Sequence, residues 1–380
     1  MTSRHPRSSR ILAIAAAVTL LVPISTSRAA ASNDGAERIR GDQWHLQYLN
    51  AYKAHRISQG DGIVVALPDT GVDAHPDIAR NLLTGADMIP GGAGNGKFDQ
   101  NSHGTGMAGL IAAHGRDAKT GALGIAPRAK ILPLYDTPSS GLGNPDDLAA
   151  SIEYATKHQA SIISISAAST PTTRLRAAVD AAVDANIIVV AAAGNAPRET
   201  GVSYPASEQG VIAVGGVDRR GNHATLSVSG PEVDVVAPAV DIYSTGIGGG
   251  YRKSSGTSDA TAIVAGAAAL IRSKYPDLPA QEVAHRLTAT AIDKGPPGRD
   301  DEYGYGVIDL VAALTADVPP LGFETPSVTT PTSTAAHDDS DDNSTARGLA
   351  TLGALLAAGG GYLVWRRRRR GDDPPPRISR

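Results

Sequence analysis

Short runs of apolar residues alternate with stretches of helical spacing through the middle of the chain. Five runs predict buried strands, because they are short and lack the apolar/polar alternation of a half-exposed strand: 63–67, 129–134, 161–165, 187–192 and 210–217. Five stretches predict helices: 104–113, 146–158, 172–185, 258–274 and 279–289. This alternation predicts βαβ units, and therefore an α/β fold with a doubly wound, mostly parallel sheet that carries helices on both faces.

The N-terminal stretch has the pattern of a secretory signal over residues 1–31. Arg4, Arg7 and Arg10 form a basic start, an apolar run follows over 11–24, and Ala29-Ala30-Ala31 offers small residues for cleavage. The alternative is a buried N-terminal helix. A short extension over 32–60 then leads into one large folded domain over 61–316.

The C-terminal end predicts a membrane anchor. At about 1.5 Å per residue, the apolar stretch 348–365 reaches about 27 Å, enough for a bilayer core. The stretch ends with the aromatic residues Tyr362 and Trp365 and is followed by the basic run Arg366–Arg370. Basic residues that flank a membrane span stay on the cytoplasmic side. We expect a transmembrane helix over 347–365, a cytoplasmic tail over 366–380, and a disordered tether rich in Pro, Thr, Ser and Asp over 317–346. The alternative is a surface helix with a basic tail.

Composition narrows the class of protein. The chain has 380 residues, of which 41% are hydrophobic and only 4% aromatic, so Ala, Val, Ile and Leu must build the core. The absence of cysteine excludes a disulfide scaffold, a thiolate nucleophile and a Cys-ligated metal. A formal net charge of −3, which averages an acidic middle with two basic ends, argues against a dedicated nucleic-acid binder.

Four polar residues stand at the ends of predicted elements, where active sites of this architecture lie. Asp69 follows the first strand, Asn195 follows another, and His103 and Ser258 open helices. Taken singly, each has a plain alternative as a turn, cap or buried polar residue. Together, Asp, His and Ser occur in the chain order of one type of serine-protease triad, with the Asn as a candidate oxyanion donor.

The chain resembles the subtilisin-like serine proteases from about Gly62 to Leu314. The resemblance is carried by Asp69-Thr70-Gly71, His103-Gly104-Thr105, Ala193-Gly194-Asn195 and Gly256-Thr257-Ser258. Signal, protease domain, tether, single span and basic tail together resemble the mycosins, membrane-anchored subtilases of actinobacterial type VII secretion. This layout implies that the extension packs on the catalytic domain, with Trp44 as an apolar anchor.

The resemblance implies a membrane-anchored, extracytoplasmic serine endopeptidase that acts on polypeptides through an acyl-enzyme. Ser258 would be the nucleophile, His103 the base, Asp69 its orienter and Asn195 an oxyanion donor. The substrate would lie as an extended strand along four residues: Ser164, Ser166, Ala167 and Ala168. Asp259, which follows the nucleophile, departs from the apolar residue common in the family, and when ionised it should oppose the oxyanion.

Several further expectations follow from the resemblance. No catalytic metal is expected, and HExxH spacing is absent. No cofactor is required, although structural calcium is a candidate, with Asp73 and Asp77 as oxygen ligands. Type VII secretion components are candidate partners. Two rival functions are a mainly structural part of a secretion complex, with weak or dispensable hydrolysis, and a soluble secreted protease.

Overall fold

A computed structural model of the chain describes residues 34–322. The predicted signal over 1–31, the predicted span over 347–365 and the tail over 366–380 lie outside the described residues, as does most of the predicted tether. Among residues 34–322, no helix is both long and apolar enough to cross a membrane.

A seven-stranded sheet forms the centre, in the order β2-β3-β1-β4-β5-β6-β7, and every neighbouring pair is parallel. The strands are β1 (Val64–Asp69), β2 (Ala86–Asp87), β3 (Lys130–Tyr135), β4 (Ile162–Ile165), β5 (Ile188–Ala192), β6 (Val211–Val217) and β7 (Val235–Pro238). The five predicted strands are confirmed. The short strands β2 and β7 were not predicted from the sequence. β1 lies where the chain turns from one direction across the sheet to the other, so its carboxyl end is a topological switch point.

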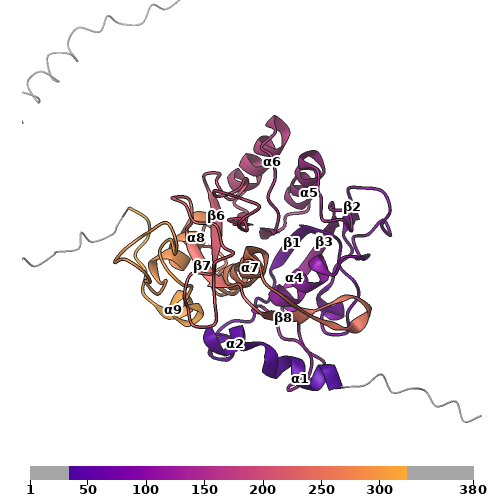
Figure 1. Cartoon of the computed structure of the whole chain (residues 1–380), viewed down its shortest axis with the longest axis horizontal. Coiled ribbons are helices and arrows are strands. Elements are labelled where there is room, and N and C mark those ends of the chain that lie inside the picture. Colours follow the sequence, from indigo (N-terminus) through magenta and orange to yellow (C-terminus); the bar gives the residue numbers. More distant parts are fainter. Residues whose placement is uncertain (1–33, 323–380) are drawn as a thin grey trace, which may run out of the picture. The chain divides into compact units, whose positions relative to one another are not determined.

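Helices cover both faces of the sheet, as predicted (Figure 1). Along β1, Val65 and Leu67 join one buried cluster and Ala66 joins the other, because successive side chains of a strand point to opposite faces. The helices of the two faces are α4 (His103–Ala112), α7 (Thr257–Lys274), α8 (Ala280–Ala289) and α9 (Leu310–Thr315) on the first, and α5 (Pro145–Lys157) and α6 (Thr173–Asp184) on the second.

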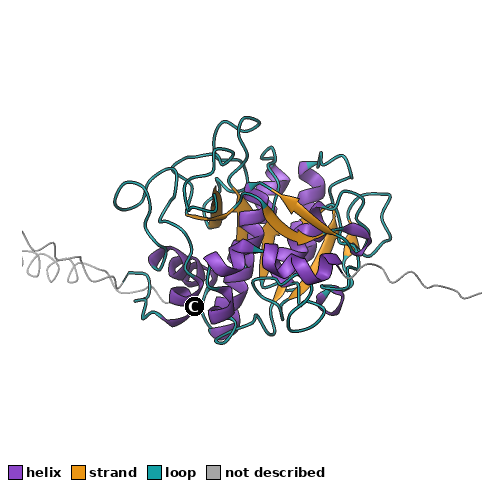
Figure 2. Cartoon of the chain, turned by 60° about the horizontal axis from the view of Figure 1, so that its bottom comes forward, coloured by secondary structure: helices purple, strands orange, loops and turns teal. Residues whose placement is uncertain are grey.

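The smaller elements complete the described part of the chain. An antiparallel hairpin joins β8 (Ile242–Thr245) to β9 (Tyr251–Ser254), and two single turns of 3₁₀ helix are η1 (Ala79–Asn81) and η2 (Ile247–Gly249). Figure 2 shows how loops surround the strands and helices. The hairpin packs on α4, where a side chain at Gly109 would meet Thr245 Oγ1 at 2.1 Å.

Helix α7 runs through the core and is buried along nearly its whole length. Its small residues allow close packing: a Cβ at Gly266 would lie 2.6 Å from Ile125 Cβ. Each buried Ile, Val or Leu side chain contributes about 1.5–3 kcal/mol to the free energy of unfolding. This packing fixes the first turn of α7, and with it Ser258, relative to the sheet.

The extension ahead of the sheet forms three short helices, α1 (Asp34–Asp42), α2 (Trp44–Tyr48) and α3 (Ala51–Ala54). Trp44 is buried, and its indole Nε1 donates to the carbonyl oxygens of Val240 (3.3 Å) and Asp241 (3.1 Å). Arg40 donates to the carbonyls of Thr120 and Gly121. The prediction that the extension packs on the domain through Trp44 is therefore confirmed.

Candidate active site

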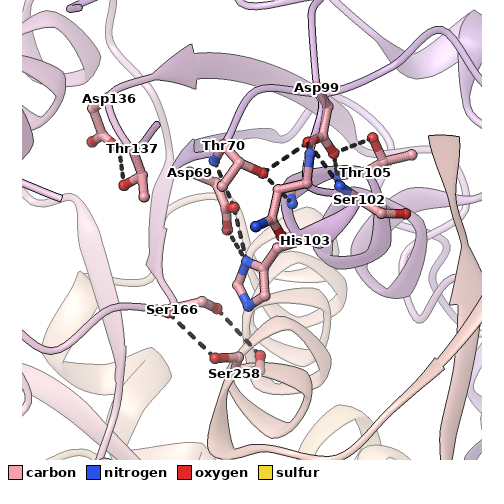
Figure 3. A network of polar contacts seen from close by, with 12 residues as sticks. Asp69, Thr70, Asp99, Ser102, His103, Thr105, Asp136, Thr137, Ser166 and Ser258 are labelled. Carbon is pink, nitrogen blue, oxygen red and sulfur yellow. Dashed lines mark hydrogen bonds and ion pairs between the residues drawn. The ribbon is translucent and has the colours of Figure 1, made fainter. Parts of the chain in front are cut away.

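Asp69 and His103 come together at the carboxyl end of β1. His103 Nδ1 lies 2.8 Å from Asp69 Oδ1 and 2.9 Å from Oδ2 (Figure 3). An ionised carboxylate accepts only, so His103 carries its proton on Nδ1 and presents Nε2 as the free acceptor. Asp69 Oδ1 also accepts from the Thr70 backbone N–H at 2.7 Å. The ring is thereby oriented for work as a general base at Nε2.

Glycines allow this approach of helix to strand. A Cβ at Gly104 would lie 2.1 Å from the Gly71 carbonyl oxygen, so only glycine lets the first turn of α4 reach the end of β1. Gly71 itself has a φ of +83°, and a Cβ there would lie 2.1 Å from the Phe98 carbonyl oxygen. The glycines beside Asp69 and His103 in the sequence are therefore required for the pair to form.

Asp99 is a site residue that the sequence pattern did not single out. Its buried carboxylate accepts from Thr70 Oγ1 (3.0 Å) and from both the N–H and Oγ1 of Thr105 (3.0 and 2.6 Å). It also accepts from the N–H groups of Asn101 and Ser102. Figure 3 shows it joining the turn after Asp69 to the first turn of α4. A signal was present, since an Asp shortly before a helix often binds the free N–H groups there.

The charge of Asp69 decides the protonation of His103. Burial alone lowers the pKa of His103, but the negative charge of Asp69 and its hydrogen bond together raise the pKa above its ordinary value of 6.5. The buried carboxylate of Asp259 acts in the same direction, and the nearby guanidinium of Arg252 acts against it. The protonated form of the ring is therefore stabilised.

Ser258 lies at the start of α7, below the His103 ring in Figure 3. Its hydroxyl donates to the Ser166 carbonyl oxygen at 3.3 Å, and Ser166 Oγ donates to the Ser258 carbonyl oxygen at 3.2 Å. This reciprocal pair links the start of α7 to the loop after β4. The hydroxyl is thus held by a long hydrogen bond at the edge of the cleft.

Asn195 has its amide orientation fixed by Thr257. The oxygen Oδ1 accepts from the Thr257 N–H at 2.9 Å and from Thr257 Oγ1 at 3.3 Å. Because a backbone N–H can only donate, the oxygen must face Thr257, and the amide nitrogen remains as a donor. Asn195 and Ser258 line the same cleft, so this geometry suits the stabilisation of a developing oxyanion.

Asp259, which follows Ser258 in the sequence, is buried. Its Oδ1 accepts from Ser254 Oγ at 2.7 Å. Burial raises its pKa to about 6, although the hydrogen bond and the positive charges of Arg252 and His103 oppose that rise. The carboxyl group is therefore neutral in weak acid and ionised at neutral pH.

A cavity of about 380 Å³ joins these residues, and its lining includes Asp69, His103, Asn195 and Ser258. Ser166, Ala167 and Ala168 form part of its wall, as predicted for the substrate edge. Ser164 differs: it lies inside β4, fully buried and paired with Val190 of β5, so it does not line the cavity. The predicted edge is therefore corrected to Ser166–Ala168, because the chain leaves the sheet only after Ile165.

The two carboxylates predicted as calcium ligands have protein partners. Both oxygens of buried Asp77 accept hydrogen bonds, from Arg116 on one side and from Tyr251 OH and the Ala122 N–H on the other. Asp73 accepts from the N–H groups of Ala74 and Gly248. Because a guanidinium already balances Asp77, this pair does not fit a calcium site. Over residues 34–322, no cluster of three or more His, Cys, Asp or Glu side chains is arranged to hold a metal ion.

Comparison with known proteins places this arrangement in a family. The Peptidase_S8 model of the subtilase family matches residues 60–306. That range includes Asp69, His103, Asn195 and Ser258.

Two curated proteins show the extent of the similarity. The chain is 39% identical over 267 residues to the thermostable alkaline protease of Halalkalibacterium halodurans, covering 70% of this chain and 71% of that protein. It is 37% identical over 335 residues to Mycosin-1 of Mycobacterium tuberculosis, covering 73% of this chain and 74% of Mycosin-1. Its relatives therefore include both an alkaline protease and a mycosin.

A solved structure of the serine protease MycP1, described as an essential component of the type VII (ESX-1) secretion system, has a similar fold. It superposes with a TM-score of 0.64 at 35% identity, covering 75% of this chain and 90% of MycP1. The observed mostly parallel α/β architecture is accordingly that of the subtilisin-like enzymes.

Proposed function

The chain belongs to the subtilase family and is a hydrolase, and from this premise we propose that it cleaves peptide bonds through an acyl-enzyme formed on Ser258. His103 takes the proton of the Ser258 hydroxyl and returns it to the leaving amine, while Asp69 holds the ring and stabilises the imidazolium. The observation that carries the proposal is the 2.8 Å contact between His103 Nδ1 and Asp69 in the cleft that Ser258 lines.

Substrate binding itself prepares the nucleophile in this proposal. A peptide that lies along Ser166–Ala168 donates a main-chain N–H to the Ser166 carbonyl oxygen, which accepts from Ser258 Oγ in the free enzyme. The displaced hydroxyl then turns toward His103 Nε2. Asn195 and the Ser258 N–H stabilise the oxyanion of the tetrahedral intermediate.

A fluorophosphonate probe tests the nucleophile directly. We expect covalent labelling of the native chain at Ser258, and none in Ser258→Ala. Ser273→Ala is a matched control, because Ser273 lies at the far end of the same helix and donates only to the Asp61 carbonyl oxygen. Labelling that persists in a folded Ser258→Ala variant, or is absent from the folded native chain, would overturn the proposal.

We further propose that the enzyme acts outside the cytoplasm, anchored by 347–365, and serves a type VII secretion system. Support comes from the basic and aromatic residues that flank that stretch and from the similarity to Mycosin-1 and MycP1. Fractionation tests the anchor: membrane-bound protein that alkaline carbonate leaves in place supports it. Release into the medium would instead favour a soluble secreted protease.

A second candidate is a mainly structural role in a secretion complex. It is favoured by Asp259, a buried carboxyl group that directly follows Ser258 and would oppose a developing negative charge when ionised. It is also favoured by the description of MycP1 as an essential component of its system. Complementation separates the two roles. If Ser258→Ala restores secretion in a deletion strain as well as the native chain does, the structural role is supported. Failure of a stably expressed Ser258→Ala chain supports the role of hydrolysis.

A further inference from the structure

The carboxylate of Glu199 lies next to the oxyanion donor, on the cleft side of the loop after β5. Glu199 Oε2 accepts from the Asn195 N–H at 2.8 Å, so the side chain is held beside the backbone of Asn195. The side chain packs over Gly194, where an added Cβ would lie 3.1 Å from Glu199 Cβ. Its side chain is only 15% exposed. A carboxylate that is partly shielded from water therefore lies in the wall of the cleft, next to Asn195.

Two cavities meet at Glu199. The cavity that contains Ser258 continues into a second one of about 360 Å³, and both are lined by Gly143, Ala168, Ser169 and Glu199. The second cavity adds small or neutral groups, among them Ser203 and Thr170. A long side chain that enters beside Asn195 would thus pass between the Ala168 wall and the Glu199 carboxylate.

The second oxygen of Glu199 is available to a ligand. The positive group paired with it is Arg198 Nε, at 4.0 Å from Oε1, and the Arg198 side chain is 77% exposed. Such an exposed pair contributes little and is easily exchanged. Arg252, another cation of the cleft, donates to the carbonyls of Ser102 and His103 on the side of α4.

Tyr204 also lines the second cavity. Its phenol oxygen is buried and has no hydrogen-bond partner among the described residues. Burial raises the pKa of Tyr204 to about 12, and the charges that act on this phenol are those of Glu208, Arg176 and Asp180. Arg176, which lies over the Tyr204 ring, is paired with Glu208 at 2.9 Å and adds little net positive charge. The Glu199 carboxylate is therefore the group of this cavity that suits a guanidinium or an ammonium group.

From this geometry we infer that Glu199 is a specificity-determining residue that selects peptides with Arg or Lys immediately N-terminal to the scissile bond. The inference rests on the proposed function, since it takes Ser258 and Asn195 as the reacting centre. A partly buried carboxylate gains a charge-assisted hydrogen bond from a basic side chain, whereas a neutral side chain of similar size leaves Glu199 with one unpaired oxygen.

Citrulline gives a sharp test, because it is a neutral near-isostere of arginine. In matched peptides that differ only at that position, we expect kcat/KM of the native full chain to be about 10- to 100-fold higher for Arg than for citrulline. Glu199→Gln keeps an oxygen that accepts from the Asn195 N–H but removes the charge, so the ratio should fall close to one. Arg198→Ala is the matched control and should keep or increase the ratio.

Binding separates this inference from the proposed hydrolysis. In the full chain with Ser258→Ala, peptides that end in Arg should bind about 10-fold or more tightly than those that end in citrulline, and Glu199→Gln in that background should abolish the difference. This binding experiment needs no catalysis. Fluorophosphonate labelling of the native chain reports separately on Ser258 as the nucleophile. Equal affinity for the two peptides, or a preference that survives Glu199→Gln, would overturn the inference even in an active enzyme.

Discussion

A buried aspartate lies near the N-terminus of each of the two helices that meet at the cleft, and the two carboxyl groups differ in how fully they are hydrogen-bonded. At the start of α4, Asp99 accepts five hydrogen bonds and holds together the turn that carries His103. At the start of α7, Asp259 accepts a hydrogen bond from Ser254, and burial raises its pKa to about 6. Both aspartates are almost inaccessible to water.

The difference shows what a buried charge needs. Five donors replace the water that Asp99 gives up, so its carboxylate stabilises local structure. Asp259 has lost its water without equal replacement, and binding a proton becomes the more favourable compensation. The proposed base, His103, therefore follows a turn whose buried carboxylate is fully hydrogen-bonded. The proposed nucleophile, Ser258, is instead followed by a group whose charge depends on pH.

The largest effect should come from removing either reacting side chain. Ser258→Ala and His103→Ala should each lower kcat by about 10⁴-fold or more, a magnitude carried over from the triad of subtilisin. The double variant should lose little more, because the two groups act in one step across the two helix starts. Steady-state kinetics on a peptide substrate measures this cycle, and strictly additive losses would contradict a coupled pair.

Asp99 should be next in importance. Asp99→Ala strips acceptors from buried N–H and hydroxyl groups, so we expect a loss of about 3–5 kcal/mol in the free energy of unfolding. Where the variant still folds, kcat should fall by about 10²-fold, since the turn no longer fixes His103. Denaturant titration in a Ser258→Ala background avoids self-digestion.

The control for Asp99 is another aspartate with several bonds. Asp117 accepts from the Lys119 N–H and from both the N–H and Oγ1 of Thr120, but it lies in an exposed turn. Asp117→Ala should cost far less stability and leave kcat unchanged. Equal losses in the two variants would show that burial of Asp99 is unimportant.

Much of the fold followed from local pattern. The five predicted strands and five predicted helices all exist, with ends within about two residues of those observed, because apolar periodicity and length are local properties. Asp69, His103, Asn195 and Ser258 were identifiable because each stands beside or close to glycine at an element end. The β8–β9 hairpin was not predicted, since its packing on α4 depends on contacts between residues far apart in sequence.

The misses at the site have the same physical origin. Ser164 was placed on the substrate edge, but strand register turns its side chain into the core, and register depends on pairing with β5. Asp99 is bonded to Thr70 only because the fold brings the two segments together. The contact of Glu199 with Asn195 is local, but the cavity in which Glu199 lies is formed by segments far apart in the sequence. Sequence position alone does not reveal such long-range contacts.

A smaller effect concerns the pH dependence of the native enzyme. Because Asp69 raises the pKa of His103 above 6.5, the base is protonated at lower pH than that raised value and cannot accept the Ser258 proton. We expect kcat/KM to rise with pH through a midpoint above 6.5, falling about tenfold per unit on the acid side. Initial rates from pH 5 to 9, with circular dichroism to confirm folding, measure it. A flat profile between pH 5 and 8 would exclude His103 as the base.

The smallest effect should be that of Asp259→Asn. This variant also tests most directly whether the carboxyl group of Asp259 differs from the fully hydrogen-bonded carboxylate of Asp99. The Asp259 charge helps to raise the pKa of His103, so its removal should move the midpoint of the activity profile to lower pH. The variant should therefore be the faster enzyme near neutral pH, where Asp259 of the native chain is ionised. Loss of a negative charge directly after Ser258 should also raise kcat several-fold at pH 8.

Stability gives an independent reading of Asp259. Its folded pKa of about 6 lies above the ordinary value of 3.8, so the folded state holds the proton more tightly and native stability falls as pH rises from 3.8 to 6. About two pKa units correspond to about 3 kcal/mol as an upper limit. The amide that Asp259→Asn introduces does not titrate. In a Ser258→Ala background, the free energy of unfolding of the variant should therefore rise relative to that of its parent as the pH increases from 4 to 8. If the two denaturation profiles stay parallel across that range, Asp259 is already ionised and satisfied in the folded state, and the contrast between the two helix starts disappears.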